Sequence, residues 1–258
     1  MDRKNGPAVR FNGLAKSFDD GASFAVATLD LEVEGGSFVA LVGESGSGKS
    51  TLLKMINRLV DPSSGTVMVG DEAIDEKSPA DLRRHIGYVF QNIGLFPHMS
   101  IAENIMIIPR LSDANSVDQV PELLDLVGLP SEVSDRLPSE LSGGQQQWVG
   151  FARALAGEPG LMLMDEPFGA LDPVTRDQLG NAYRDLHDRL GLTTIMVTHD
   201  MAEALLIADR ILVMSEGRVV ADGTPEALLA GEGGEEASAL IAVPKGQMAK
   251  LRELEARR

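Results

Sequence analysis

One short segment limits the fold of this chain more than any other, because eight residues match the pattern G-x-x-x-x-G-K-[ST] in full. Glycines let the backbone curl so that successive N–H groups converge on one anion, and a following helix adds the positive end of its dipole. The lysine supplies a charge for the β- and γ-phosphates of a nucleotide, and the last hydroxyl can bind Mg²⁺. The pattern therefore predicts a phosphate-binding loop. Its residues are Gly43, Glu44, Ser45, Gly46, Ser47, Gly48, Lys49 and Ser50.

The sequence on either side of this loop provides the context that the motif requires. The continuous apolar run 38–42 is typical of a buried central strand, and residues 51–60 carry apolar side chains at helical spacing. We therefore count Thr51, at the start of this helix, among the candidate nucleotide-binding residues. The alternative is a Gly/Ser turn with an accidental lysine, which needs neither a strand before it nor a helix after it.

The rest of the chain alternates between strand and helix patterns. A helix is expected over 174–190, and residues 100–156 are mainly helical in pattern, with breaks at Pro109, Gly128 and Pro138. This alternation around a helical insertion predicts an α/β fold. We expect a P-loop NTPase core, a mixed sheet with flanking helices, together with an antiparallel β subdomain and a helical subdomain. The expected strands cover 9–14, 24–33, 66–69, 86–90, 161–164 and 194–197.

The domain organisation follows from the same pattern. We expect a nucleotide-binding domain over residues 1–230, with its helical subdomain at about 92–157, followed by a short linker and helical tail over 231–258. The Gly/Glu-rich stretch 231–236 is the nearest approach to a linker, and a last amphipathic segment comes after it.

Polar side chains follow two of the expected strands. A buried strand that runs directly into Asp165 and Glu166 is costly unless those charges have partners, such as a metal ion and a polarised water. We expect Asp165 to complete a Mg²⁺ shell, and Glu166 to orient or deprotonate the attacking water. The alternative is a strand that simply ends in solvent. His199 follows a third strand of the same core and can reach toward a γ-phosphate, whereas His85, His98 and His187 are expected to be structural or on the surface.

A second Gly-rich segment precedes a helical stretch. By the same physics as the first loop, Ser142, Gly143, Gly144 and Gln145 at a helix start form a second anion-binding site. One nucleotide does not need two such sites within one fold. The sequence therefore predicts a dimer in which the second site covers the nucleotide held by the other subunit.

Composition excludes several classes of protein. The chain has 39 Asp+Glu against 23 Lys+Arg, a net charge of −16, which argues against binding to nucleic acid or directly to an anionic membrane. The absence of Cys excludes disulfides, thiolate metal sites and Cys nucleophiles. No apolar run approaches the ~18 residues of a membrane span, and the N-terminus lacks the apolar region of a secretory signal. We expect a cytoplasmic chain, unless a partner holds it elsewhere.

These motifs, in this order, resemble those of the ATP-binding subunits of ABC transporters, from about Val9 to Leu229. The resemblance implies a Q-loop at Gln91, which senses the metal and the γ-phosphate, and a D-loop at residues 170–172. Phe18 falls where the family has an aromatic that stacks on adenine, although an ordinary strand-edge residue is the alternative. The implied cofactors are ATP and Mg²⁺, with the metal bound by Ser50, Gln91 and Asp165.

The resemblance also implies partners and a location. The family forms head-to-tail dimers with two ATP molecules between phosphate loop and signature, and we expect a homodimer. Integral-membrane permease subunits and an extracytoplasmic solute-binding protein complete such complexes. The chain is therefore expected at the cytoplasmic face of the cell membrane, held there by the permease. The apolar segment 92–111, with Phe96, Met99, Ile101 and Met106, is either a docking surface for the permease or helical core.

Three stretches resemble the importers of quaternary-amine osmoprotectants such as glycine betaine, carnitine and choline: residues 53–59, 90–98 and 164–173. The third stretch is shared with several importer subfamilies. The expected function is thus an ATPase that drives uptake of such a solute. Another small solute such as an amino acid, and a non-transport ABC ATPase, remain as alternatives. Many members of this subgroup continue into C-terminal regulatory domains of the cystathionine-β-synthase type, for which the sequence up to Arg258 has no room.

One departure from the family pattern concerns the signature helix. The family usually continues its signature as Q-Q-R, whereas this chain has Gln146, Gln147 and Trp148. A cation is thus replaced by a large apolar ring. Either Trp148 packs against a neighbouring helix, or a contact to the dimer partner is altered.

Overall fold

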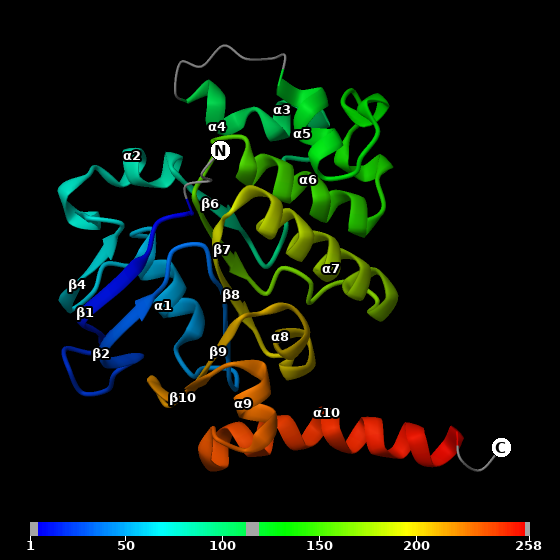
Figure 1. Cartoon of the computed structure of the whole chain (residues 1–258). Coiled ribbons are helices and arrows are strands. Elements are labelled where there is room, and N and C mark those ends of the chain that lie inside the picture. Colours follow the sequence, from blue (N-terminus) through cyan, green and yellow to red (C-terminus); the bar gives the residue numbers. More distant parts are fainter. Residues whose placement is uncertain (1–4, 112–118, 256–258) are drawn as a thin grey trace.

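The larger of two sheets forms the centre of the molecule (Figure 1). The computed structural model describes residues 5–111 and 119–255, and in this part of the chain the sheet has the strand order β10-β9-β3-β8-β7-β6. All neighbours are parallel except β9 and β10, which form an antiparallel hairpin. This mixed sheet with helices packed on it confirms the predicted α/β fold. The strands are β3 (Phe38–Val42), β6 (Ile86–Val89), β7 (Leu161–Asp165), β8 (Thr193–Thr198), β9 (Arg210–Ser215) and β10 (Arg218–Gly223).

The smaller sheet is entirely antiparallel in the described residues, with the strand order β2-β1-β4-β5. It confirms the antiparallel subdomain that the alternating runs near the N-terminus predicted. Phe24 lies outside β2 and is half exposed, so the second strand begins two residues later than expected. The strands are β1 (Val9–Lys16), β2 (Val26–Val33), β4 (Ser64–Val69) and β5 (Glu72–Ala73).

Helices cover the sheets, and α3 to α6 form a group on one side of the molecule (Figure 1). The α-helices are α1 (Lys49–Ile56), α2 (Pro79–Arg84), α3 (Ile101–Ile105), α4 (Ile107–Arg110), α5 (Val120–Leu126), α6 (Gly143–Leu155), α7 (Pro173–Leu190), α8 (Met201–Ile207), α9 (Pro225–Ala230) and α10 (Gly234–Glu255). Short 3₁₀ helices cover Ile74–Glu76, Ser131–Val133 and Pro138–Glu140.

Some expected helix boundaries are wrong. Pro109 lies inside α4 rather than at a break, because a proline in the first turn of a helix has no N–H that the helix needs. The break is at Met106, between α3 and α4. The helix after the phosphate loop ends at Ile56 instead of residue 60, since Arg58 has a left-handed φ of 54°. Residues 112–118, within the predicted helical stretch, lie outside the described residues.

The C-terminal part of the larger sheet and the expected linker also differ from the sequence-based prediction. The sequence analysis missed the β9–β10 hairpin, although Glu216 and Gly217 both have positive φ, as a two-residue hairpin turn of type I′ requires. Helix α10 begins at Gly234, so the second half of the expected linker 231–236 is helical. Helix α10 then extends away from the sheets (Figure 1).

Strand β3 is buried on both faces, which explains its continuous apolar sequence. Phe38, Ala40 and Val42 pack into one core cluster with side chains of α6 and α7. Val39 and Leu41 pack into a second cluster with α1 and the smaller sheet. Because strand side chains alternate between faces, these five residues contribute to both cores.

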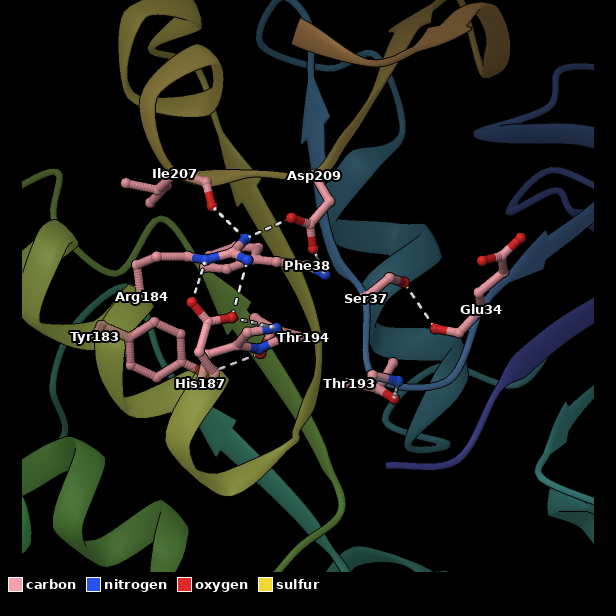
Figure 2. Close-up of polar contacts among 12 residues, drawn as sticks. Glu34, Ser37, Phe38, Tyr183, Arg184, His187, Thr193, Thr194, Ile207 and Asp209 are labelled. Atoms are coloured by element: carbon pink, nitrogen blue, oxygen red, sulfur yellow. Dashed lines mark hydrogen bonds and ion pairs between the residues drawn. The ribbon is translucent and has the colours of Figure 1, made fainter. Parts of the chain in front are cut away.

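The beginning of β3 is fixed by an arginine on α7 (Figure 2). The Arg184 guanidinium donates to Asp209 Oδ1 at 2.7 Å and to the carbonyl oxygen of Ile207 at 3.1 Å. The second oxygen of Asp209 accepts the N–H of Phe38 at 2.8 Å. One ion pair thus joins α7, the end of α8 and the first residue of β3, at the opposite end of the strand from the phosphate loop.

Two buried side chains of α7 meet the next strand beside this ion pair (Figure 2). The Tyr183 hydroxyl and Nδ1 of His187 lie 3.0 Å and 2.9 Å from the hydroxyl oxygen of Thr194 in β8. His187, which the sequence analysis expected to be structural or on the surface, is structural and buried. Burial, and then the positive charge of Arg184, lower its pKa from the ordinary 6.5, although Asp188 and Asp209 oppose this shift.

The lowered pKa of His187 predicts a pH-dependent stability. The unfolded chain takes up the proton at a higher pH than the folded chain, so the free energy of unfolding falls as the pH drops below about 6.5. His187→Asn, which removes this titration, should reduce the loss of stability between about pH 7 and about pH 5. Urea denaturation at several pH values measures this difference. The exposed His85→Asn should behave as the unsubstituted chain does, and an unchanged pH dependence in His187→Asn would contradict the assignment.

Candidate functional site

The predicted phosphate-binding loop connects β3 directly to α1, and its lysine lies inside the curl. Lys49 is only 5% exposed, and its Nζ donates to the carbonyl oxygens of Gly43 at 2.8 Å and Glu44 at 2.6 Å. It also donates to the Ser47 hydroxyl at 3.1 Å. Burial lowers the pKa of the Lys49 ammonium, and the negative charges of nearby Glu166 and Asp165 oppose that shift. A cation is therefore fixed where the sequence predicts bound phosphates.

Glycine is required in this loop by backbone geometry. Gly48 has a φ of 101°, and a Cβ there would lie 2.2 Å from the carbonyl oxygen of Ala25. It also occupies the N-cap position of α1, where no side chain accepts the free N–H groups. The first turn of α1 therefore leaves donors and a positive dipole end available to an anion. The exposed residues Glu44, Ser45 and Gly46 form the outer part of the loop, and Thr51 follows in the first turn of α1.

Helix α1 and strand β7 meet through a hydroxyl and a carboxylate. Ser50 Oγ donates to Asp165 Oδ1 at 2.7 Å, and Asp165 is only 6% exposed. Lys54 Nζ lies 3.6 Å from the other carboxylate oxygen. Hydroxyl and carboxylate oxygens are the ligands that Mg²⁺ prefers, so these residues fit the predicted metal. In residues 5–111 and 119–255, His, Asp and Glu nowhere form a group of three that could hold a metal ion alone.

Three of the predicted catalytic residues meet at one carboxylate. Gln91 Nε2 donates to Glu166 Oε2 at 3.1 Å, and His199 Nδ1 lies 3.3 Å from the same oxygen. Glu166 has a left-handed φ of 47°, and its N–H bonds to the carbonyl oxygen of Val197 in β8 at 2.9 Å. This backbone strain is held by the neighbouring strand and directs the side chain toward Gln91 and His199. A carboxylate in this position can orient a water molecule or accept its proton.

The second predicted anion site lies on a different part of the chain. Ser142 caps α6, accepting the N–H of Gln145 at 3.3 Å, and the Gln145 side-chain oxygen accepts the N–H of Ser142 at 3.0 Å. A Cβ on Gly144 would lie 2.8 Å from the Thr175 side chain, and one on Gly143 would contact Leu171. Within the described residues, no hydrogen bond or ion pair joins this segment to residues 43–50.

Asp172 and Phe18 are the remaining predicted nucleotide contacts. The Asp172 carboxylate caps α7, accepting the N–H groups of Val174 and Thr175 at 3.1 Å each. Hydrogen bonds from Thr175 and Val174 lower the pKa of this carboxyl group. Phe18 is 68% exposed, and the ammonium of Lys16 lies 4.8 Å from its ring centroid. Such a ring offers a free face on which a base can stack.

Two cations near the site were missed by the sequence analysis. Lys54 follows Ser50 by four residues on α1, so helical spacing could have placed it on the same face toward Asp165. Arg153 of α6 is buried and donates to the carbonyl oxygens of Ile93 and Gly94 at 2.6 Å and 2.7 Å. Only the tertiary structure brings Arg153 to the segment after Gln91, and no sequence spacing indicates this contact.

Trp148, which replaces the usual arginine, packs within this chain. Its indole is partly buried against the larger core cluster, and its ring centroid lies 5.4 Å from that of Phe151 on the same helix. Phe151 in turn stacks on Tyr183 of α7, with centroids 4.9 Å apart. The indole therefore extends an aromatic cluster between α6 and α7.

Comparison with known proteins agrees with these motifs. The model of the ABC transporter family matches residues 26–169. The glycine betaine/carnitine/choline transport ATP-binding protein OpuCA of Bacillus subtilis (strain 168) is 50% identical over 212 residues, which are 81% of this chain and 56% of the relative. The chain belongs to the ABC transporter family. It spans little more than half the length of OpuCA.

Other ABC proteins are similarly close. The glycine betaine uptake system ATP-binding protein YehX of Escherichia coli (strain K12) is 50% identical over 224 residues, covering 86% of this chain and 72% of the relative. The ATP-binding cassette MJ0796, in a dimeric post-hydrolysis structure bound to ADP and Pi, superposes with a TM-score of 0.73 at 31% identity, covering 84% of this chain and 98% of the cassette. Among the residues described for the present chain, no helix combines the length and apolar character needed to cross a membrane.

The geometry of the ABC phosphate loop predicts different costs for two glycine substitutions. Gly46→Ala meets no atom within 4 Å, so its cost is that of a left-handed alanine, about 1 kcal/mol. Gly48→Ala adds a clash with the backbone at Ala25 and should lower the free energy of unfolding by clearly more than Gly46→Ala. Urea denaturation compares the two variants, and equal losses of stability would contradict the described loop conformation.

Proposed function

We propose that this chain is the ATP-hydrolysing subunit of an ABC importer. The observation that carries the proposal is the convergence of Gln91 and His199 on Glu166, while the adjacent residue Asp165 bonds to Ser50 of the phosphate loop. Two separate halves of a phosphoryl-transfer site thus meet at one edge of the sheet.

Hydrolysis at this site assigns a role to each of these side chains. The loop N–H groups, the start of α1 and Lys49 bind the phosphates, since they provide converging donors and a fixed cation. Glu166 orients the attacking water and accepts its proton as the water oxygen bonds to the γ-phosphorus and the bond to ADP breaks. His199 lies beside Glu166 and donates toward the γ-phosphate.

A magnesium ion would be held beside the phosphates by Ser50, Asp165 and Gln91. The first two residues already share a hydrogen bond, and their oxygens suit this metal. When bound, Mg²⁺ neutralises phosphate charge. Few protein ligands suffice, because Mg²⁺ is commonly bound by one or two carboxylates together with phosphates and water.

The second anion site supports a dimer. The segment Ser142, Gly143, Gly144 and Gln145 has the N-terminus of α6 behind it, yet makes no polar contact with residues 43–50 among the described residues. We infer that it covers ATP held by the phosphate loop of a second copy. Phe18 stacks on the adenine of the ATP that its own copy holds. Asp172, at the start of α7, lies beside this segment and shares the nucleotide interface. The dimeric MJ0796 structure supports this assembly.

We also propose the domain division that the sequence pattern predicts. Residues 1–230 form the nucleotide-binding domain, with the helical subdomain at about 92–157, and residues 231–258 form the linker and tail. Contacts of α10 with α8, α9 and β10, together with the burial of Ala237 and Ile241, support a tail whose first half packs against this domain.

Quaternary amines are the proposed class of transported solute. The relatives named for glycine betaine, carnitine and choline transport are 48–50% identical over 81–86% of this chain. Relatives named for sulfate and thiosulfate import are 43% identical over 84%. The alternatives of another small solute and of a non-transport ATPase are therefore less well supported. The solute itself would be bound by an extracytoplasmic binding protein and a permease.

The proposed docking site for the permease is a hollow of about 540 Å³ next to Gln91. Phe90 and Phe96 line it and are each nearly half exposed. Ile101 and Met106, which the sequence analysis grouped with Phe96, are instead buried in the core, and Met99 is partly buried. Exposed aromatic rings beside a catalytic loop favour a protein contact. Docking there would hold the chain at the cytoplasmic face of the membrane.

The catalytic assignment predicts the behaviour of Glu166→Gln. The amide keeps the shape of the side chain but cannot accept the proton of water, so ATP should bind with little change while hydrolysis falls by on the order of a hundredfold or more. A fluorescent ATP analogue measures binding, and phosphate release measures turnover. Normal turnover in this variant would overturn the proposed function.

The docking assignment predicts the behaviour of Phe96→Asp. A charge in place of this exposed aromatic ring should abolish co-purification with the permease and the stimulation of ATP hydrolysis that the permease provides. Val243→Asp, at an exposed apolar residue of α10, serves as the matched control and should retain both. Thermal unfolding verifies that both variants fold. Retained stimulation in Phe96→Asp would exclude this docking site.

A further inference from the structure

Arg176 connects two loops of the proposed hydrolysis site. It lies in the first turns of α7, with its side chain 29% exposed. One end of its guanidinium, Nη1, lies 3.3 Å from Asp200 Oδ2, directly after His199 in sequence. The other end, Nη2, donates to the carbonyl oxygen of Leu171 in the D-loop at 3.2 Å and to that of Gly169, just before this loop, at 3.5 Å.

Both loops lead back to the same residue, Glu166. The N–H of Gly169 donates to the carbonyl oxygen of Glu166 at 3.3 Å, which closes the turn between them. His199 contacts the Glu166 side chain at 3.3 Å. The contacts therefore form a closed ring from Glu166 through the D-loop to Arg176, on to Asp200 and His199, and back to Glu166.

Asp200 is a rigid partner for Arg176. Its Oδ1 caps α8 by accepting the N–H groups of Ala202 at 2.9 Å and Glu203 at 3.2 Å. Its own N–H donates to the Thr198 hydroxyl at 3.0 Å. One carboxylate oxygen is thus occupied by the helix, and the other is free to accept from Arg176.

The positive charge of Arg176 also reaches Glu203, the third residue of α8. Burial raises the pKa of Glu203, a hydrogen bond with Thr198 lowers it, and the positive charge of Arg176 also lowers it. A planar guanidinium can reach Asp200 and the D-loop carbonyl oxygens at once, whereas a lysine ammonium can satisfy only one side.

We propose that Arg176 is a positioning residue that fixes the D-loop relative to His199, so that Glu166 and His199 keep the spacing hydrolysis requires. The proposal rests on the proposed ATPase function. It assigns no contact between Arg176 and ATP. Its loss should therefore affect turnover more than nucleotide binding.

The test compares the ATPase kinetics of Arg176→Ala, Arg176→Lys, Asp200→Asn and the double variant Arg176→Ala/Asp200→Asn. Asp200→Asn keeps an oxygen to cap α8 but replaces the acceptor of Arg176 by an amide. We expect Arg176→Ala to lower kcat by about ten- to a hundredfold, with the Kd for a fluorescent ATP analogue within about twofold. Arg176→Lys should recover part of kcat, and the double variant should resemble the single variants, because all of them break the same contact.

Arg189→Ala on the same helix is the matched control and should leave kcat unchanged. Among the described residues, the Arg189 side chain bonds only to the carbonyl oxygen of Leu126. Unchanged kcat in Arg176→Ala, an equal loss of ATP affinity, or multiplicative effects in the double variant would each overturn the positioning role. Glu166→Gln separates this failure from that of the proposed function. If the unsubstituted chain and Glu166→Gln hydrolyse ATP equally, the ATPase proposal itself fails.

Discussion

The position of the phosphate-binding loop depends on the burial of β3 on both faces. Its five side chains enter two separate core clusters, and its first N–H is held by Asp209 through the Arg184 ion pair. The strand can neither slide nor rotate without opening one of the cores. The loop therefore starts from a fixed point, and Lys49 can be buried against its carbonyl oxygens without a separate supporting element.

Strand order explains why distant residues share one site. Strands β3, β8 and β7 are adjacent and parallel, so the loops after them leave the sheet at the same edge. Residues 43–50, His199 and the pair Asp165 and Glu166 are therefore neighbours in space. The strained φ of Glu166 is stabilised by the same arrangement, because its N–H bonds to the adjacent strand β8.

Local residue types and their spacing in the sequence predicted much of this architecture. Contacts between residues far apart in the sequence could not be predicted in this way. The glycines and Lys49 marked the loop, and the apolar run of β3 marked the central strand, because both signals are local. The four-residue spacing from Ser50 to Lys54 puts both side chains on one face of α1, so it predicts that Lys54 also lies near Asp165. In contrast, Arg153 bonds to backbone carbonyl oxygens of a remote segment, which have no side-chain signature. Arg176 pairs with Asp200 on a separate loop, and no local sequence pattern indicates this pair. The predicted break at Pro109 was wrong because a proline in the first turn of a helix does not interrupt it.

The bonds from Arg153 to the segment after Gln91 leave the outer side chains of that segment free to vary. Arg153 binds the main-chain oxygens of Ile93 and Gly94, so the attachment to α6 does not depend on which side chains these positions carry. Mutations could therefore change the exterior of the segment while its bonds to α6 persisted. In the proposed docking, the side chains that contact a partner and the main-chain bonds that hold the segment on α6 would thus be separate, and either could change without the other.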